Sequence, residues 1–210
     1  NSFPVTNISM FISFEGIEGS GKSTQIKIIS ETLQKKGYKV ISVREPGGTI
    51  VGEKIRDIFL QDTDENFDPL TEVLLLYASR KQLDNEIIKP NLNKGTIVIA
   101  DRFYDATKAY QCYGKGVDIN LVDSLHEQLN ISKPDLSIYI DINPELSKER
   151  IANRKADRIE QESIEFFERV QNGYLELEKT SDNFFLVDGS KSIEYISDEI
   201  ERLIIDYLNV

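Results

Sequence analysis

The stretch MFISFEGIEGSGKSTQ, residues Met10–Gln25, decides the fold of this chain. Its central part, Gly16–Ser23, reads GIEGSGKS and matches the phosphate-loop pattern G-x-x-x-x-G-K-[ST] at every fixed position. The apolar run Met10–Glu15 predicts a buried strand before the loop, and a helix is predicted to begin near Lys22. Glycines permit positive φ angles that gather N–H groups around one anion, and the helix N-terminus adds a positive dipole end. The stretch therefore predicts a strand–loop–helix unit that binds phosphate.

Two side chains of this loop carry the chemistry that the motif needs. Lys22 is expected to reach the β- and γ-phosphates of a nucleoside triphosphate, and the Ser23 hydroxyl is expected to bind Mg²⁺. The alternative is a glycine turn that binds nothing, which the flanking strand and helix disfavour.

Composition limits the classes of protein to consider. The 210 residues suit one α/β domain with a sizeable core, and the net charge of −11 argues against a nucleic-acid or anionic-membrane surface. Cys112 is the only cysteine, so a reducing, cytoplasmic compartment fits. No apolar run approaches the roughly 20 residues of a membrane span, and no export signal is recognisable. Residues 1–9 are polar and without pattern, so we expect a flexible extension before one domain at 10–210.

Strands and helices alternate along the chain. Short, almost wholly apolar strands suit a parallel sheet that is covered on both faces, and alternation with right-handed crossovers predicts a three-layer αβα sandwich with five parallel strands. The predicted strands are Met10–Glu15, Lys39–Val43, Thr96–Ala100, Leu136–Ile140 and Phe184–Val187. The predicted helices are Lys22–Lys36, a short one around Val51–Phe59, Pro69 to about Asn91, Asp105–Gln111, Asn120–Asn130, one capped by Asn143, one capped by Ser163, and a closing stripe over Ile193–Leu208.

Charged side chains follow three of these strands. Glu18 lies in the loop after the first strand, Arg44 and Glu45 follow the second, and Asp101 and Arg102 follow the third. Ligands of such sheets bind beyond the carboxyl ends of the strands, so these groups should converge on one crevice. One loop would hold a triphosphate, and the two arginines would be available for a second anion, since guanidinium groups suit phosphate oxygens.

The same residues have ordinary alternatives. Arg44 could be a solvated loop arginine, and Asp101 with Arg102 could form a weak surface ion pair. Arg80 follows an apolar run in mid-helix, so it either extends to solvent or points into a pocket. A basic cluster could be a solvated helix face, and its members are Lys148, Arg150, Arg154, Lys155 and Arg158. The single His126 and Cys112 fit packing roles better than metal binding or nucleophilic chemistry.

Five motifs taken together resemble the bacterial thymidylate kinases. They are FEGIEGSGKSTQ at 14–25, REPGGT at 44–49, DRF at 101–103, AYQ at 109–111 and DRIEQES at 157–163. The phosphate loop alone would not single out this family, but the other motifs and their spacing extend the resemblance over nearly all of Met10–Val210. The resemblance implies a P-loop NTPase fold, ATP and dTMP as substrates, ADP and dTDP as products, Mg²⁺ as cofactor, and a homodimer. The long helix from Pro69 to about Asn91 and its neighbours are candidates for the dimer interface.

The resemblance also implies the donor site. Lys22 would contact the β- and γ-phosphates, Ser23 would bind the magnesium ion, and Asp101 would lie near that ion, through water. The loop that would hold the ATP phosphates consists of Gly16, Ile17, Glu18, Gly19, Ser20, Gly21, Lys22, Ser23 and Thr24.

The acceptor site is implied in the same way. Glu18 matches an acid beside the deoxyribose 3′-hydroxyl, and Arg44 and Arg102 match the arginines that hold the acceptor phosphate. Arg80 matches an arginine that bonds the thymine ring. The other edge of the ring would be read by Thr107 and Gln111, and the family's usual stacking aromatic is replaced here by Leu76, with Tyr77 next to it.

Residues 148–161 match the mobile lid of the family. The phosphate loop has Gly19 and Ser20 but no arginine, which resembles the type in which the lid supplies the catalytic arginine. Arg154 is the first choice for that role and Arg158 the second. An ionised phosphate acceptor needs no strong general base, so positioning and charge neutralisation can account for catalysis.

Two other functions remain open on sequence grounds. One is a kinase for another nucleotide or nucleoside, such as dUMP, since one methyl group is worth only about 1–3 kcal/mol in an apolar pocket. The other is a nucleotide-driven switch. The chain lacks the N-K-x-D and D-x-x-G motifs of guanine-binding switches, and a switch would have little use for a second anion site.

Overall fold

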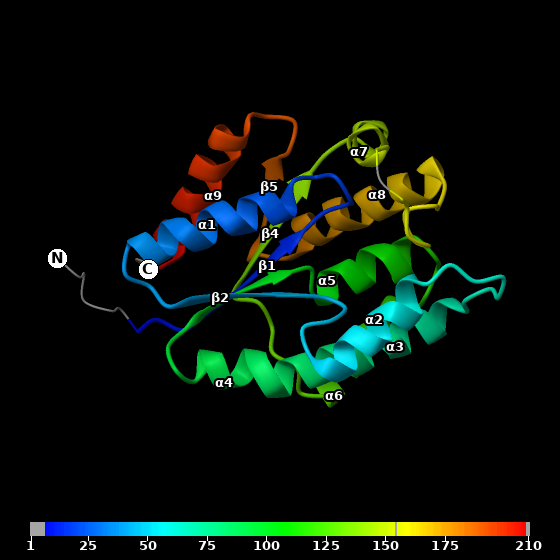
Figure 1. Cartoon of the computed structure of the whole chain (residues 1–210), viewed down its shortest axis with the longest axis horizontal. Coiled ribbons are helices and arrows are strands. Elements are labelled where there is room, and N and C mark those ends of the chain that lie inside the picture. The colour runs from blue at the N-terminus through cyan, green and yellow to red at the C-terminus, as the bar shows by residue number, and fades with distance from the viewer. Residues whose placement is uncertain (1–6, 154, 209–210) are drawn as a thin grey trace.

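A computed structural model describes residues 7–153 and 155–208 (Figure 1). Within these residues the strands form one parallel sheet in the order β2-β3-β1-β4-β5, which confirms the predicted five-stranded sheet. Every residue of the central strand β1 is buried because helices cover both faces of the sheet. The strands are β1 (Met10–Glu15), β2 (Val40–Arg44), β3 (Ile97–Asp101), β4 (Leu136–Asp141) and β5 (Phe184–Asp188).

Helices form a layer on each side of the sheet, as predicted. Helices α1 (Lys22–Lys35) and α9 (Ile193–Leu208) pack on one face, above the sheet in Figure 1. Helix α2 (Ile50–Leu60) packs on α3, and α7 (Pro144–Ile151) packs on α8. The elements associated with the opposite face are α3 (Pro69–Leu83), η1 (Asp84–Ile88), α4 (Lys89–Leu92), α5 (Tyr104–Thr107), η2 (Lys108–Tyr113), α6 (Ile119–Gln128) and α8 (Ile164–Thr180).

Helix starts follow the capping signals of the sequence. The Asp68 side chain accepts hydrogen bonds from the backbone N–H groups of Leu70 and Thr71, and Pro69 occupies the first helical position. Asn143 and Ser163 cap α7 and α8 in the same way. These side chains satisfy N–H groups that have no partner inside the helix, so polar residues mark the helix starts.

Two predicted helices contain π-helical segments. The helix from Pro69 continues to Leu92 through η1, and the helix that carries Gln111 becomes η2. A π turn closes i→i+5 hydrogen bonds, so it rotates the following side chains relative to an ordinary helix. The four consecutive residues Ala109–Cys112 are all buried, a pattern that a 3.6-residue period does not predict.

The chain was predicted to begin with an extension at residues 1–9. Residues 7–9 precede β1 without regular structure, and residues 1–6 of that extension lie outside the described residues. Among the helices in residues 7–153 and 155–208, none has the length and apolar character needed to cross a membrane. The buried apolar residues instead gather between the sheet and its two helical layers.

Candidate active site

The phosphate loop follows β1 at the carboxyl edge of the sheet. Gly16 has φ 137°, and a Cβ atom there would lie 2.6 Å from the Ile140 carbonyl oxygen, so only glycine fits. Lys22 Nζ donates to the carbonyls of Gly16 and Ile17 at 2.9 and 3.1 Å, which folds the side chain back over the loop. Burial, with Arg102 as the second cause, lowers the pKa of Lys22 to about 8. Helix α1 begins at Lys22, so its N-terminus faces the loop.

The two residues predicted to bind metal lie close together at this loop. Ser23 Oγ donates to Asp101 Oδ2 over 3.2 Å, and the pair brings together the two predicted metal residues from α1 and β3. No cluster of three or more His, Cys, Asp or Glu side chains suited to a metal occurs in residues 7–153 and 155–208. Mg²⁺ that bridges nucleotide phosphates needs only one or two protein oxygens, so a hydroxyl and a carboxylate fit this ion.

Helix α7, whose last four residues begin the predicted lid, contacts the phosphate loop. Ser147 Oγ donates to the Glu18 carbonyl, and Arg150 Nη1 donates to the Gly19 carbonyl at 3.1 Å. The Arg150 guanidinium also reaches the Gly189 carbonyl at 3.3 Å. One member of the basic cluster, Arg150, therefore contacts the loop with its guanidinium, although the residue itself is exposed. No sequence signal marked this contact.

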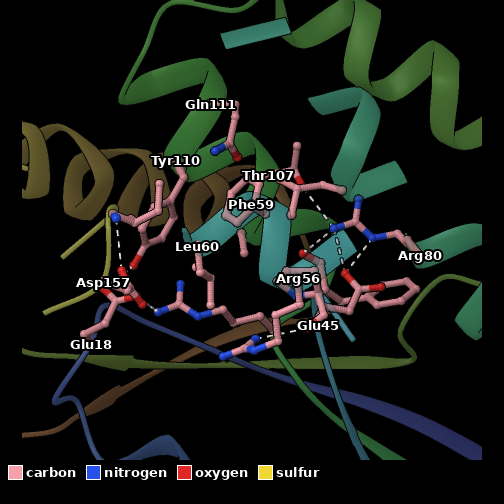
Figure 2. Close-up of a pocket in the computed structure, with 16 residues that line it drawn as sticks. Glu18, Glu45, Arg56, Phe59, Leu60, Arg80, Thr107, Tyr110, Gln111 and Asp157 are labelled. Carbon is pink, nitrogen blue, oxygen red and sulfur yellow. Dashed lines mark hydrogen bonds and ion pairs between the residues drawn. The ribbon is translucent and has the colours of Figure 1, made fainter. Parts of the chain in front are cut away.

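A second pocket lies beside the loop and is lined in part by residues of α3 and η2 (Figure 2). Figure 2 shows Glu18 at one end, Arg80 and Glu45 at the other, and Gln111 pointing in from above. The predicted acceptor residues that line this pocket are Glu18, Leu76, Arg80, Arg102, Thr107 and Gln111. Six of the seven predicted acceptor residues therefore surround one cavity, and Arg44 is the exception.

Arg80 points into the pocket and does not extend to solvent, which were the two alternatives for its mid-helix position. Its side chain is 1% exposed, and its Nε donates to Glu45 Oε2 at 2.7 Å. Its Nη2 donates to Thr107 Oγ1 at 2.9 Å and to the Phe103 carbonyl at 3.2 Å. Its Nη1 is buried and has no partner. Burial raises the pKa of Glu45 to about 7, although Arg80 opposes this.

Gln111 is held from behind by Glu72 of α3. Gln111 Nε2 donates to Glu72 Oε2 at 2.9 Å, while Gln111 Oε1 is buried without a partner. Leu76, one helical turn before Arg80, supplies an apolar wall of the same pocket. The pocket thus combines an apolar surface with one unpartnered donor and one unpartnered acceptor.

Arg102 is paired with Glu18, not with its neighbour Asp101. Arg102 Nη2 donates to Glu18 Oε1 at 2.6 Å, and its guanidinium lies 4.8 Å from the centre of the Tyr110 ring. Tyr110 donates its hydroxyl to Glu18 Oε2 at 2.8 Å. Burial opposes ionisation of Glu18, but Arg102 and then Lys22 hold its pKa below the ordinary value. Arg102 has φ 69°, a conformation that non-glycine residues seldom adopt and that occurs often at functional sites.

Arg44 lies apart from this pocket. It is exposed and forms an ion pair with Glu53 at 2.7 Å. It lines a neighbouring open hollow together with Ser23 and Asp101, because β2 and β3 pair with Arg44 opposite Asp101. Arg56 of α2 lines the acceptor pocket instead, and it donates to the Pro46 carbonyl at 3.0 Å. No sequence signal marked Arg56, because an arginine on an amphipathic helix is ordinary.

The two candidate lid arginines differ in what can be described. Arg158 donates to Glu72 Oε1 at 2.7 Å and to the Phe59 carbonyl at 3.0 Å, and it lies 4.4 Å from the Phe67 ring centre. Arg154 lies outside the described residues. One further pocket residue, Tyr110, was missed as a site residue although it lies in the AYQ motif. Glu45, which was expected at this edge of the sheet, lines the pocket.

A phosphate loop beside an arginine-lined second pocket, on a parallel α/β sheet, defines a P-loop kinase. The thymidylate kinase family model matches residues 14–200 of the chain. A thymidylate kinase of Thermosipho africanus is 46% identical over 200 residues, covering 95% of this chain and 99% of the relative. One from Legionella pneumophila is 44% identical and covers 94% of each chain. A crystal structure of thymidylate kinase from Ehrlichia chaffeensis has a TM-score of 0.76 at 33% identity, covering 97% of this chain and 100% of that one.

The chain therefore belongs to the thymidylate kinase family. Its activity is the ATP-dependent phosphorylation of dTMP to dTDP. The resemblance seen in the sequence motifs and the expected enzyme class are confirmed.

Proposed function

We propose that the pocket of Figure 2 binds dTMP with its base against Arg80 and Gln111. The observation that supports this most is the pair of buried atoms without a partner, Arg80 Nη1 and Gln111 Oε1. Thymine offers an acceptor at O4 and a donor at N3–H, whereas cytosine carries a donor at N4 and an acceptor at N3. An unpartnered donor and acceptor therefore suit thymine, and burying the wrong base would leave polar groups unpaired.

The sugar and phosphate of dTMP would extend toward the phosphate loop. Glu18, fixed by Arg102 and Tyr110, would accept a hydrogen bond from the 3′-hydroxyl. Arg102 would hold the acceptor phosphate from inside the pocket, while Arg44 would approach it from the hollow beside Asp101. Two guanidinium groups would offset the repulsion between the acceptor phosphate and the triphosphate.

The phosphate loop would hold ATP, with Lys22 leaving the loop carbonyls for the β- and γ-phosphates. Ser23 and Asp101 would hold Mg²⁺, which supplies positive charge to the phosphate oxygens when bound. The acceptor phosphate is already an anion, so the residues need to align it and neutralise charge rather than remove a proton.

Residues 148–161 would act as the lid that excludes water. The contact of Arg150 with the loop supports a lid that lies against the donor site. Arg154 remains the proposed catalytic arginine on the strength of the family pattern, and Arg154→Ala should lower turnover on the order of a thousandfold. The contacts of Arg158 with Glu72 and Phe59 support a structural part for Arg158 instead of the catalytic role considered as second choice.

The enzyme is also proposed to be a homodimer. The candidate interface consists of α3 and its neighbours, which include α2 and α6. Exposed apolar side chains on these three helices support it: Ile50, Val51, Ile58, Leu70, Leu74 and Leu121. Sedimentation velocity should give a dimer for the native chain and a monomer for Leu74→Glu. A cytoplasmic location stays a prediction, with the free, buried Cys112 in keeping with a reducing compartment.

The proposed site is tested by ADP release with ATP and Mg²⁺ over a panel of acceptors. We expect dTMP to be turned over fastest, dUMP more slowly, and dCMP, dGMP, AMP and thymidine weakly. Equal rates for dTMP and dCMP would contradict the base contacts assigned to Arg80 and Gln111. ATP binding without turnover of any monophosphate would remove the whole acceptor site.

A further inference from the structure

Glu72 is a charged residue that lies behind the acceptor pocket and does not line it. Its side chain is 0% exposed, in the first turn of α3. Its two oxygens face different partners. Oε2 accepts from Gln111 at 2.9 Å, and Oε1 accepts from Lys115 at 2.9 Å and from Arg158 at 2.7 Å. Neither the binding of ATP nor the transfer of phosphate uses this carboxylate.

The chemistry of a carboxylate determines how Gln111 is oriented. An ionised carboxylate only accepts hydrogen bonds, whereas a glutamine amide has a donor end and an acceptor end. Glu72 Oε2 therefore selects the NH₂ group of Gln111, and the carbonyl must take the other direction. Gln111 Oε1 is the end that is left without a partner in the buried wall of the pocket.

Two cations compensate the buried charge of Glu72. Lys115 comes from the turn after η2, and Arg158 comes from the DRIEQES motif at the end of the predicted lid. Lys115 also pairs with Glu162 at 2.9 Å, which ties the same motif to Glu72 a second time. Without such partners a fully buried carboxylate would be costly, so the cluster keeps an acceptor-only group behind Gln111.

We propose that Glu72 is a positioning residue for base selection. It fixes the Gln111 amide with the carbonyl toward the base, so that N3–H of thymine or uracil is accepted. Cytosine presents an acceptor at N3, which would face the Gln111 carbonyl, itself an acceptor. This inference rests on the proposed binding of dTMP in the pocket. It assigns the selectivity to a residue that touches no substrate, and it places the end of the lid motif in the same cluster.

The test compares Glu72→Gln with the native enzyme. A glutamine at 72 both donates and accepts, so the Gln111 amide is free to turn over. A site built for one hydrogen-bond pattern strongly rejects a base with the reverse pattern, and a Gln111 amide that can turn over loses this rejection. We therefore expect the ratio of kcat/KM for dTMP to kcat/KM for dCMP to fall by about tenfold or more. The ratio for dTMP to dUMP should not change, since both bases carry N3–H and O4.

The matched control is Glu162→Gln, which alters a carboxylate on the same Lys115 without touching Gln111. This variant should keep the native dTMP to dCMP ratio. Glu72→Gln is also combined with Gln111→Ala. If Glu72 acts through Gln111, Glu72→Gln should not change the dTMP to dCMP ratio any further in a protein that already carries Gln111→Ala. The inference would be overturned if Glu72→Gln left the dTMP to dCMP ratio unchanged. It would also be overturned if Glu72→Gln lowered the ratio equally with Gln111 present and with Gln111→Ala.

A measurement on the native protein covers the case in which Glu72→Gln does not fold. The side-chain NH₂ signals of Gln111, identified by their loss in Gln111→Ala, should be protected from solvent exchange without ligand and should stay protected when dTMP binds. Rapid exchange, or a hydrogen bond transferred from Glu72 to dTMP, would refute the role. If the native enzyme itself does not prefer dTMP over dCMP, the proposed function fails. If it does and these tests fail, only Glu72 loses its role.

Discussion

The donor and acceptor sites of this enzyme are built in opposite ways. The phosphate loop is formed by consecutive residues, and its shape depends on backbone groups and on glycines such as Gly16. The proposed acceptor pocket is lined by side chains from distant segments: Glu18 of the phosphate loop, the β2–α2 region, α3, the segment from β3 to η2, and residues 157 and 159. Its charged residues are held in pairs, among them Arg80 with Glu45 and Arg102 with Glu18.

This difference predicts how substitutions should affect the chemistry and the stability of each site. A side chain of the loop can be replaced with loss of chemistry but little loss of stability, because the backbone carries the shape. A buried pair of the pocket cannot lose one partner without leaving the other charge uncompensated. Substitutions in the two sites should therefore separate loss of chemistry from loss of stability.

Lys22→Met should affect chemistry far more than folding. Turnover at saturating ATP and dTMP should fall by roughly a hundred- to a thousandfold, since a group that stabilises the developing charge is lost. The free energy of unfolding should change by only about 1 kcal/mol, the net worth of hydrogen bonds such as those to the Gly16 and Ile17 carbonyls. Steady-state rates and urea unfolding measure the two effects. Near-native turnover together with a large loss of stability would reverse the contrast.

Arg80→Met should affect folding strongly. It leaves Glu45 buried without its cation, which should lower the free energy of unfolding by about 3 kcal/mol at pH 8. Urea unfolding measures this, and the double variant with Glu45→Gln is the control that should regain part of the loss. A single variant as stable as the native enzyme would mean that the pair does not need both charges.

The stability of the protein should fall as pH rises from 6.5 to 8. Burial, with Asp105 as the second cause, raises the pKa of Glu15 from 4.5 to about 8. In this window the folded chain holds more protons than the unfolded chain, so the free energy of unfolding decreases with pH. Glu45, raised to about 7, acts with the same sign. His126, lowered from 6.5 to about 3, opposes this below the window, and Lys22, lowered to about 8, opposes it above.

Glu15→Gln should flatten this dependence. The amide cannot titrate, but its carbonyl can still accept the hydrogen bond that Phe103 N–H gives to Glu15 at 2.9 Å. Urea unfolding at pH 6.5, 7.2 and 8 compares the native enzyme with the variant. An equal slope in both proteins would show that Glu15 is not the group responsible.

Glu53→Gln should have the smallest effect. The Arg44–Glu53 pair has side chains 52% and 42% exposed, and exposed pairs contribute about 0–1 kcal/mol. The free energy of unfolding should therefore change by no more than about 1 kcal/mol. Arg80→Met and Glu53→Gln each break an ion pair of 2.7 Å, so they isolate the effect of burial. Similar losses in the two variants would remove burial as the explanation.

The sequence was most informative where neighbouring residues act together. The strand–loop–helix unit at Met10–Gln25, the caps at Asp68, Asn143 and Ser163, and the five parallel strands were predicted from local patterns and are confirmed. These features depend on backbone hydrogen bonds and apolar periodicity within a few residues. A single sequence records such constraints directly.

Directions of single side chains depended on packing between distant segments. Arg80 points inward because Glu45, 35 positions away in the chain, accepts its hydrogen bond, and Arg44 turns toward Glu53. The π segment η2 aligned Gln111 with the pocket, and no period in the sequence marked it. Arg56 lines the pocket because α2 packs on α3, and no local sequence pattern indicates this packing.

The sequence by itself determined the sheet, the phosphate loop and the family, because each is a pattern of contiguous or regularly spaced residues. The tertiary structure decided which charges meet: Arg102 with Glu18, Arg80 with Glu45, and Glu72 with Gln111, Lys115 and Arg158. Electrostatic and hydrogen-bond partners are chosen over a few ångströms in space, and separation along the chain does not record that distance.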